Sequence, residues 1–503
     1  MKNILLLITL VSLTQLNASG QSRTLKKQIS DFDSYVELAR NDWKVPGLAV
    51  AVVKGDQVIF QKAYGVREVG TDKLVDTNTL FACASTTKAM TAACMGILVD
   101  EGKLQWTDKV SKYLPELQLQ EPYVTKELTI RDLFLHNSGV GNTDFLWSSM
   151  QISSEEILQR MRLVEPSYSF RSSFIYQNIF YLAAGQIIEK VADEPWASYI
   201  ERRIFEPLGM NRTVPLLKMV RDENQTRPHQ LRNGEVVTLT DMSADEIGPA
   251  GSVWSSIDDI GKWVKCMLDS SKYNGGRLLS ANSWKELFIP SAIIPRREFY
   301  PTATLTNPNW TTYGLGWFQQ DYRGKKINFH TGSLPGSIAI HGQLPDEKIG
   351  VYVFGNLDHA EVRHAIMYKA FDLFALGGTR DWSTEFKELY QKLDLEQSRK
   401  KDESVKARVI GTSPSHPLPQ FEGIYSDPLY GSIAVKAEGD QLSISLNQVV
   451  LAKLSHWHYD TFYGPFDNWW FGDVTAKFET DTMGKISRIN FGGMVFSKQY
   501  TNH

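Results

Sequence analysis

The 503-residue sequence is poor in cysteine, and its acidic and basic residues nearly balance. Its three cysteines, Cys83, Cys94 and Cys266, cannot all pair with one another, so a disulfide framework is not the basis of the fold. The formal charge of −3, without a long run of like charge, gives no electrostatic reason to expect a nucleic-acid partner. We therefore expect an ordinary globular protein with packed, unpaired cysteines.

Long apolar runs are also scarce. The run from Ile4 to Leu16 is too short for a comfortable membrane span, and no cysteine follows it that could carry a lipid anchor. Met1-Lys-Asn3 precedes the run with a positive charge, and Ala18-Ser-Gly20 follows it with small residues. This pattern predicts a signal peptide over residues 1–20 and a secreted or periplasmic protein without a stable membrane span. An N-terminus that stays tethered in the membrane is the alternative.

One short stretch, residues 81–90, contains a serine and a lysine at helical spacing. Apolar residues recur from Met90 to Leu98, and Gly102 stands where a left-handed residue would end a helix. Ser85 then lies at or near the helix N-terminus, and Lys88 follows on the same face. A serine beside a desolvated lysine can become an activated nucleophile. Because serine is also a common helix cap, the pattern alone favours capping.

The order of patterns along the chain predicts one sheet assembled from both ends of a large domain. A hairpin over residues 48–64 and an antiparallel meander over residues 325–354 flank a mostly helical part, and a helix over 360–376 follows. Within the helical part, residues 248–254 are predicted to form a loop. This is an α+β fold with an inserted helical subdomain.

Three further side chains have both a structural and a chemical interpretation. Tyr176 lies just before a helix predicted over residues 179–191, which Asn178 would cap, and buried tyrosines usually pack their rings and hydrogen-bond their hydroxyls. His330 lies on a predicted strand, on the face opposite Ile327 and Phe329, where a hydrogen bond across the sheet would account for it.

The C-terminal part changes character. Residues 382–408 are charged and compatible with a helix, and residues 411–419 have the composition of a linker. From residue 420 onward, short alternating strands rich in aromatic residues predict a separate antiparallel, barrel-like β-domain. Its His456 and His458 are too few to make a metal site.

In chain order, three motifs now line up: Ser85-x-x-Lys88, Tyr176-x-Asn178 and His330-Thr-Gly332. Their flanks are Tyr113-Leu-Pro, His136-Asn-Ser-Gly, Tyr313-Gly-Leu-Gly-Trp and Pro335-Gly. On these residues the chain resembles the serine β-lactamase-related, penicillin-binding-protein-like hydrolases, most of all class C β-lactamases, D-amino-acid peptidases and family VIII esterases. The C-terminal region resembles the small β-barrel domain appended to many such hydrolases.

The resemblance implies a β-lactamase/transpeptidase-like antiparallel sheet with helices and an inserted helical subdomain. The expected division is a signal peptide over 1–20, a β-lactamase-like serine hydrolase domain over 27–377, a charged helix and Pro-rich linker over 378–419, and a β-domain over 420–500. It further implies that Ser85 attacks a carbonyl to form an acyl-enzyme, with Lys88, Tyr176 or both as the base.

The remaining roles that the resemblance implies concern the substrate. Asn178, His330, Thr331 and Gly332 would bind it, and the backbone N–H groups of Ser85 and Ser333 would form the oxyanion hole. No metal or cofactor is implied. The substrate would be a small molecule or short peptide, for example one derived from the cell wall.

One position departs from the β-lactamase pattern, in which the third motif normally begins with lysine rather than His330. Histidine there is common in the peptidase and esterase branches. We therefore expect a secreted serine hydrolase of amide or ester bonds, of the D-aminopeptidase, carboxypeptidase or esterase type. The alternatives are a true β-lactamase and, in another class, a non-catalytic protein that binds or senses peptidoglycan fragments. The sequence leaves the oligomeric state open.

Overall fold

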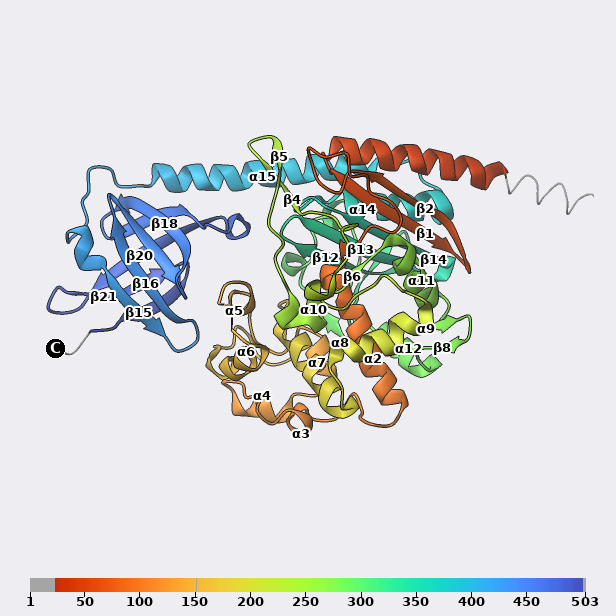
Figure 1. Ribbon diagram of the computed structural model, residues 1–503, viewed down its shortest axis with the longest axis horizontal. Coiled ribbons are helices and arrows are strands. Elements are labelled where there is room, and N and C mark those ends of the chain that lie inside the picture. Colours follow the sequence, from red (N-terminus) through yellow and green to blue (C-terminus); the bar gives the residue numbers. More distant parts are fainter. Residues whose placement is uncertain (1–22, 151, 501–503) are drawn as a thin grey trace, which may run out of the picture. The chain divides into compact units, whose positions relative to one another are not determined.

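The computed structural model describes residues 23–150 and 152–500, which divide into two compact units (Figure 1). The first comprises the chain up to Leu117, Pro122–Asn142 and Pro166–Tyr390, and the second comprises Gln118–Glu121, Thr143–Glu165 and the chain from Gln391 onward. The predicted signal peptide, residues 1–20, lies outside the described residues. Over those residues no helix has both the length and the apolar character needed to cross a membrane.

The first unit is built on an eight-stranded antiparallel sheet in the order β2-β1-β14-β13-β12-β11-β10-β9. Its strands are β1 (Gly47–Lys54), β2 (Gln57–Gly65), β9 (Ala292–Ile293), β10 (Thr311–Tyr313), β11 (Phe318–Tyr322), β12 (Lys325–Leu334), β13 (Ser337–Leu344) and β14 (Ile349–Gly355). The predicted hairpin is β1–β2, and the predicted meander is β12–β13–β14. Because β1 pairs directly with β14, the two ends of the unit's sequence meet in one sheet, as predicted.

Helices cover both faces of this sheet. Helix α11 (Ile257–Leu268) packs on Gly350 of β14, and α14 (Val362–Phe371) packs on Gly342 of β13. Gly342 pairs with the residue next to Gly350, so the two glycines face opposite sides. A Cβ atom at either position would lie 2.5 Å or less from a helix side chain, so glycine permits both helices to approach closely. The central strands are consequently buried on both faces.

The part between β2 and β9 is mostly helical, as predicted. In the first unit its helices are α2 (Thr87–Asp100), α3 (Val110–Tyr113), α4 (Pro122–Glu127), α7 (Ile179–Ala192), α8 (Trp196–Ile200), α9 (Glu206–Leu208), α10 (Gly248–Gly251), α11 and α12 (Ala281–Leu287), and α13 (Ala303–Thr306) follows β9. Three short strand pairs accompany them: β3 (Phe81–Ala82) with β6 (Trp254–Ser255), β4 (His229–Arg232) with β5 (Glu235–Thr238), and β7 (Lys272–Tyr273) with β8 (Gly276–Arg277).

The loop prediction for residues 248–254 is wrong, because this stretch contains α10 followed by β6. Pro249 lies in the first turn of α10, where a proline loses no hydrogen bond. The turn is held by packing, since a Cβ at Gly185 of α7 would lie 2.1 Å from Pro249 Cγ. Glycine and proline in a short stretch are typical of a loop, which is why the sequence predicts one here. The packing against α7 that holds the helical turn is a tertiary contact, which the local sequence does not show.

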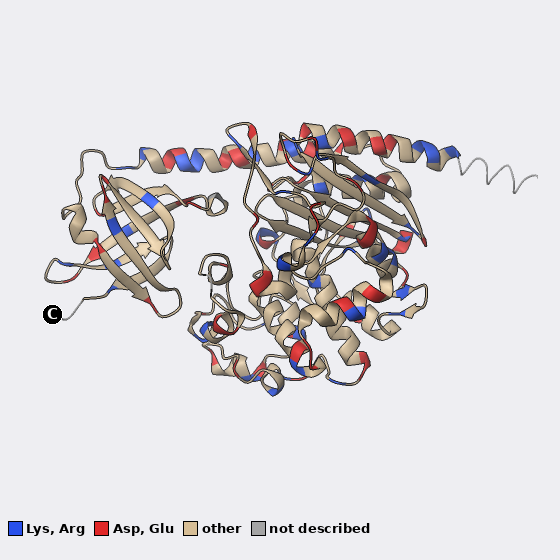
Figure 2. Cartoon of the chain, viewed as in Figure 1, with Lys and Arg blue, Asp and Glu red and all other residues tan. Residues whose placement is uncertain are grey.

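A helix over residues 23–42 packs on the sheet beside the start of α15 (Trp382–Lys406). Phe32 contacts the Phe60 ring edge to face, and Trp43 Nε1 donates to Ser383 Oγ at 3.1 Å. The buried residues of α15 all lie in its first part, and residues of both charges line the helix along its length (Figure 2). The predicted charged helix is thus confirmed.

The second unit contains a closed barrel of eight strands, β15 to β22 (Figure 1). They are β15 (Gly423–Asp427), β16 (Gly431–Glu438), β17 (Gln441–Leu446), β18 (Val449–His458), β19 (Thr461–Pro465), β20 (Asp473–Thr480), β21 (Ile486–Phe491) and β22 (Met494–Lys498). Along β20 the alternate residues Val474, Ala476 and Phe478 are buried, the period expected of a barrel wall. The barrel-like module predicted from the sequence is confirmed.

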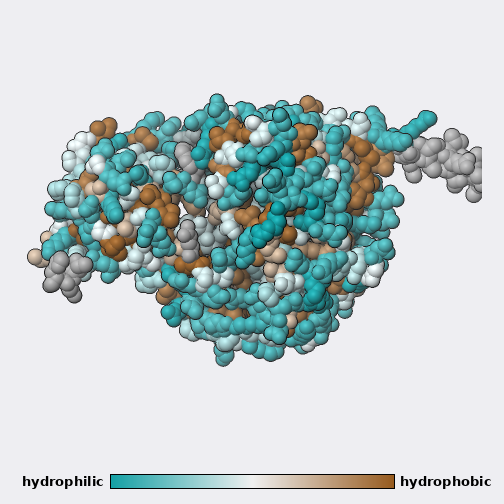
Figure 3. Space-filling view, viewed as in Figure 1, coloured by the Kyte–Doolittle hydropathy of each residue, from teal (hydrophilic) through white to brown (hydrophobic). Residues whose placement is uncertain are grey.

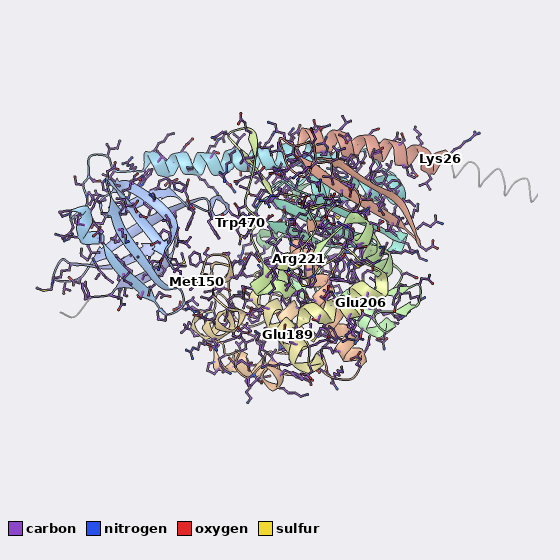
Figure 4. The ribbon with its side chains drawn as sticks, viewed as in Figure 1. Lys26, Met150, Glu189, Glu206, Arg221 and Trp470 are labelled. Carbon is purple, nitrogen blue, oxygen red and sulfur yellow. The ribbon has the colours of Figure 1, made fainter. Side chains whose placement is uncertain are left out.

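The same unit includes residues 143–165, which carry α5 (Phe145–Ser148) and α6 (Ser154–Arg160). Arg160 Nη1 donates to Leu429 O at 2.5 Å, and Asn447 Nδ2 donates to Met150 O at 2.9 Å (Met150 is labelled in Figure 4). The Phe145 ring meets Tyr430 edge to face. The barrel therefore holds a segment that lies about 270 residues earlier in the chain.

Candidate active site

Ser85 is the point at which a buried segment opens to solvent. From Thr79 to Leu98 every residue is buried except Ser85. It lies in a 3₁₀ turn, Ala84–Thr86, between β3 and α2. The preceding Ala84 has a φ of 47°, a left-handed conformation that costs a non-glycine residue about 1–2 kcal/mol. The strained turn presents the hydroxyl at the surface of the unit, as a nucleophile requires.

Lys88 lies one turn along, in the first turn of α2, and its side chain is fully buried. Its Nζ lies 3.1 Å from Ser85 Oγ, 2.7 Å from Asn178 Oδ1 and 2.8 Å from Ala250 O. Of these three oxygens, only the Ser85 hydroxyl carries a proton that could be transferred. The amide and carbonyl oxygens instead fix the position of the nitrogen.

The Tyr176 ring lies close to the same lysine. The Lys88 Nζ lies 4.8 Å from the centroid of the Tyr176 ring and 5.2 Å from that of Tyr181. The imidazole of His136 packs on Tyr176 with ring centroids 4.3 Å apart. The sequence-predicted Ser85, Lys88 and Tyr176 therefore meet in one place.

His136 has the form of a packed, neutral side chain. Its Nδ1 accepts a hydrogen bond from the Gln177 backbone N–H at 3.0 Å, so the ring proton is on Nε2. Burial lowers the pKa of His136 well below its usual range. The hydrogen bond from the Gln177 N–H to His136 also fixes the neighbouring Tyr176, whose ring packs on the imidazole.

Asn178 occupies the N-cap position of α7, as predicted, but its side chain makes no capping hydrogen bond there. The predicted position of Asn178 is thus correct, but the predicted capping hydrogen bond is not made by its side chain. Its Oδ1 accepts a hydrogen bond from the buried Lys88 Nζ instead.

His330 is buried on β12, with both ring nitrogens engaged. Its Nδ1 lies 2.6 Å from Thr331 O, which can only accept, so Nδ1 carries the proton. Its Nε2, 2.8 Å from Tyr313 Oη, then accepts from that hydroxyl. Burial lowers the pKa of His330 to about 3, so the imidazole is neutral at neutral pH. Its role in substrate binding remains a prediction.

The next three residues of β12 lie against the nucleophile's turn. A Cβ at Gly332 would lie 2.2 Å from Cys83 O and 3.1 Å from Ser85 N, so only glycine permits this approach. The Thr331 hydroxyl is hydrogen-bonded to Tyr300 Oη. Ser333 is the only residue between Ile327 and Leu344 that is not buried. The two half-exposed serines, Ser85 and Ser333, thus belong to two backbones in contact.

Two contributors escaped the sequence analysis as functional residues. Ala250 contributes only its carbonyl oxygen, which no side-chain motif can signal. Tyr313 was noted only within its Gly-rich motif, and its hydroxyl orients His330. Among the described residues, no group of three or more His, Cys, Asp or Glu side chains is placed to hold a metal ion.

The comparisons with known proteins agree with this architecture. Residues 32–373 match the family model "Beta-lactamase", and residues 407–502 match a "Domain of unknown function (DUF3471)". The unguisins hydrolase ungD of Aspergillus violaceofuscus is 28% identical over 449 residues, which cover 80% of this chain and 76% of that protein.

Two solved structures share the fold at 21% identity. The octameric penicillin-binding protein homologue from Pyrococcus abyssi has a TM-score of 0.61 and covers 93% of this chain and 100% of its own. The D-stereospecific amidohydrolase from Streptomyces sp. has a TM-score of 0.55 and covers 69% and 99%. With a family model over more than half of its length and the expected sheet, helices and motifs in place, the chain belongs to the beta-lactamase family of hydrolases.

Proposed function

We propose that this protein is a serine hydrolase that cleaves amide or ester bonds of small peptides or acyl compounds through an acyl-enzyme on Ser85. The observation that carries the proposal is the hydrogen bond between the buried Lys88 Nζ and the half-exposed Ser85 Oγ at 3.1 Å. The relative from Aspergillus violaceofuscus is named a hydrolase of unguisins, which supports hydrolysis as the reaction class.

The first step is attack of Ser85 Oγ on the substrate carbonyl carbon. As the new C–O bond forms, the hydroxyl proton passes to Lys88, the basic group hydrogen-bonded to it. When the bond to the leaving group breaks, that group takes a proton from Lys88 directly, or from Tyr176, which then regains a proton from the adjacent Lys88. Water then attacks the acyl-enzyme by the reverse sequence and releases the acid.

The developing oxyanion needs two donors on the same side of the reacting carbonyl. The backbone N–H groups of Ser85 and Ser333 are suited to this role because Gly332 permits their two backbones to touch. Removing one donor from such a pair typically costs about 10²–10³ in kcat, so we expect this contact to be essential for fast turnover.

The neutral imidazole of His330 bears on the substrate class. A penicillin or cephalosporin carries a carboxylate that a fixed cation helps to hold, and His330 supplies no charge at neutral pH. Esters and aminoacyl amides have no such carboxylate, so the missing cation does not weaken their binding. We therefore propose faster turnover of short acyl esters or aminoacyl amides than of cephalosporins, at a secreted or periplasmic location.

Labelling with a fluorophosphonate, read by intact-protein mass, tests the mechanism. The wild type should gain one adduct that maps to Ser85, and Ser85→Ala should gain none while keeping its thermal unfolding transition. Ser252→Ala is the matched control because Ser252 is buried in hydrogen bonds to Pro215 O and Gly248 O. An adduct on Ser138 or Ser252 would contradict the assignment, and an unlabelled wild type would favour a non-catalytic binding protein.

A substrate panel tests the class. We expect kcat/KM for a p-nitrophenyl ester or a D- or L-aminoacyl anilide to exceed that for nitrocefin, and the ratio to stay constant between pH 5.5 and 8 because His330 remains neutral throughout. A preference for nitrocefin by orders of magnitude would favour a true β-lactamase. Location is tested separately, by N-terminal sequencing of the exported protein for cleavage after Gly20.

A further inference from the structure

A buried ion pair lies behind the strand that carries Ser333. Arg363, in the first turn of α14, donates from Nη2 to Glu361 Oε1 at 2.8 Å and from Nε to Oε2 at 3.2 Å. Arg363 is 3% exposed and Glu361 is 7% exposed. His364 Nδ1 lies 2.7 Å from the same carboxylate. Burial by itself would raise the pKa of Glu361, but Arg363 and His364 hold it well below its usual range, so the pair is ionised.

The remaining nitrogen of the guanidinium, Nη1, donates hydrogen bonds to β12. Arg363 Nη1 donates to Gly332 O at 2.5 Å and to Ser333 Oγ at 2.8 Å. It also lies 3.4 Å from Ala339 O, and Ala339 is the residue that pairs with Gly332 across the β12–β13 ladder. The guanidinium therefore sits on the β13 side of the Gly332 carbonyl.

That carbonyl and the Ser333 N–H belong to one peptide group. A trans peptide is planar, so its C=O and N–H point in opposite directions and cannot turn independently. With the carbonyl directed toward β13, the Ser333 N–H points to the other edge of β12. On that edge the pairing with β11 ends at Phe329, before Ser333 is reached.

Two further effects act through this contact. A charge-assisted hydrogen bond to the carbonyl polarises the amide and makes its N–H a stronger donor. A buried ion pair contributes little stability compared with apolar residues of the same volume, because its desolvation offsets its attraction. Stability alone therefore gives little reason for a charged side chain at this position.

We propose that Arg363, anchored by Glu361, is a positioning residue that orients and polarises the Gly332–Ser333 peptide as an oxyanion donor. This inference rests on the acyl-enzyme function proposed above. In this role Arg363 acts through the peptide that it holds.

The test compares Arg363→Gln with Arg363→Lys and Glu361→Gln. We expect Arg363→Gln to lower the rate of acylation about 100-fold, the usual cost of a lost oxyanion donor, while KM changes little. Arg363→Lys keeps the positive charge but cannot bond Glu361 and Gly332 O at the same time with separate nitrogens, and Glu361→Gln removes the charge that holds Arg363 in place. The acylation rates of both variants should therefore lie between those of Arg363→Gln and the wild type. Arg363→Lys carries the test if the glutamine variant does not fold.

The control is Arg323→Gln, because Arg323 likewise pairs with a buried carboxylate, Asp372, and with a backbone carbonyl, Gly377 O. Its acylation rate should match that of the wild type. A second readout is the infrared stretching frequency of the acyl-enzyme carbonyl, which an intact oxyanion hole lowers. We expect a higher frequency in Arg363→Gln and Arg363→Lys and no change in Arg323→Gln.

The outcomes separate the two proposals. Arg363 variants that acylate at the wild-type rate with an unchanged carbonyl frequency would overturn this inference and leave the proposed function standing. A wild type that forms no adduct at Ser85 would overturn both. A uniform loss of activity with an unchanged carbonyl frequency in the folded variants would show that Arg363 only stabilises the fold.

Discussion

Lys88 and Asn178 are joined by a buried hydrogen bond, with Nζ donating to Oδ1 at 2.7 Å. The two residues lie 90 positions apart, at the starts of α2 and α7. Asn178 belongs to the same motif as Tyr176, two residues further along the chain. This hydrogen bond therefore links the Ser85-x-x-Lys88 motif to the Tyr176-x-Asn178 motif. Because an amide oxygen is neutral, it positions the lysine without adding a negative charge to hold the proton on it.

The neutrality of Asn178 can be tested by replacing it with aspartate. A carboxylate 2.7 Å from Nζ would favour the protonated lysine, so the proposed base would work only at higher pH. We expect Asn178→Asp to acylate about 100-fold more slowly at neutral pH and to shift the pH–rate profile upward. Asn328→Asp is the control, since the Asn328 amide accepts from Gln319 instead. An unchanged profile in Asn178→Asp would speak against Lys88 as base.

The approach of β12 to the nucleophile's turn predicts a severe effect of a single methyl group. In Gly332→Ala the new Cβ would lie 2.2 Å from Cys83 O, and neither backbone can move without displacing Ser85 or Ser333. We expect a loss of about 1–3 kcal/mol in the free energy of unfolding and a large fall in labelling rate. Both are measured by thermal unfolding and by intact mass.

Gly261→Ala supplies the contrast on the same chain. Its new Cβ on α11 would meet nothing closer than 3.7 Å, and alanine is the better helix former. This variant should be stabilised by up to about 1 kcal/mol with unchanged labelling. Equal tolerance of both substitutions would mean that the β12 contact does not constrain the site.

Buried neutral histidines predict instability toward acid. Burial lowers the pKa of His341 to about 3, whereas the unfolded chain has about 6.5. Between these values the unfolded state binds the extra proton, so stability present above pH 6.5 is lost as pH falls toward 3. His341→Phe keeps a ring between Trp317 and Tyr352 and removes the titration.

We therefore expect the wild type, relative to His341→Phe, to lose up to about 1.4 kcal/mol of unfolding free energy per pH unit below 6.5. Denaturant unfolding at pH 7.5, 6, 5 and 4.5 measures this difference. Parallel curves for the two proteins at every pH would contradict the buried neutral state of His341. The same sign applies to His330, whose pKa is lowered to about 3 as well.

Residues 143–165 belong to the same unit as the barrel, so removing the barrel should affect them. Ending the chain at Lys406 removes Leu429, Tyr430 and Asn447, which contact this segment. The sheet and its helices should still fold, but residues 143–165 should become sensitive to protease. Limited proteolysis with mass mapping compares the truncated and full-length proteins, and equal protection of the segment in both would refute the prediction. The face of the full-length protein seen in Figure 3 is largely hydrophilic.

Patterns within short stretches were sufficient for much of the architecture. The hairpin over β1–β2, the meander over β12–β14, helices α2 and α7 and the barrel were all predictable because periodicity and turn residues are local signals. The S-x-x-K, Y-x-N and H-T-G motifs singled out residues that the structure brings together, because side-chain chemistry at fixed spacing is written in the sequence.

Only the tertiary structure decided what those residues contact. Asn178 looked like a helix cap and instead accepts from Lys88, and the Gly-Pro stretch looked like a loop and instead forms α10, which presents Ala250 O. Arg363 lies 31 residues from Gly332 and carried no signal in the sequence, although it grips the peptide that precedes the Ser333 N–H. The physical reason is that backbone carbonyls, burial and the neutrality of His330 arise from packing between distant segments, which local sequence does not specify.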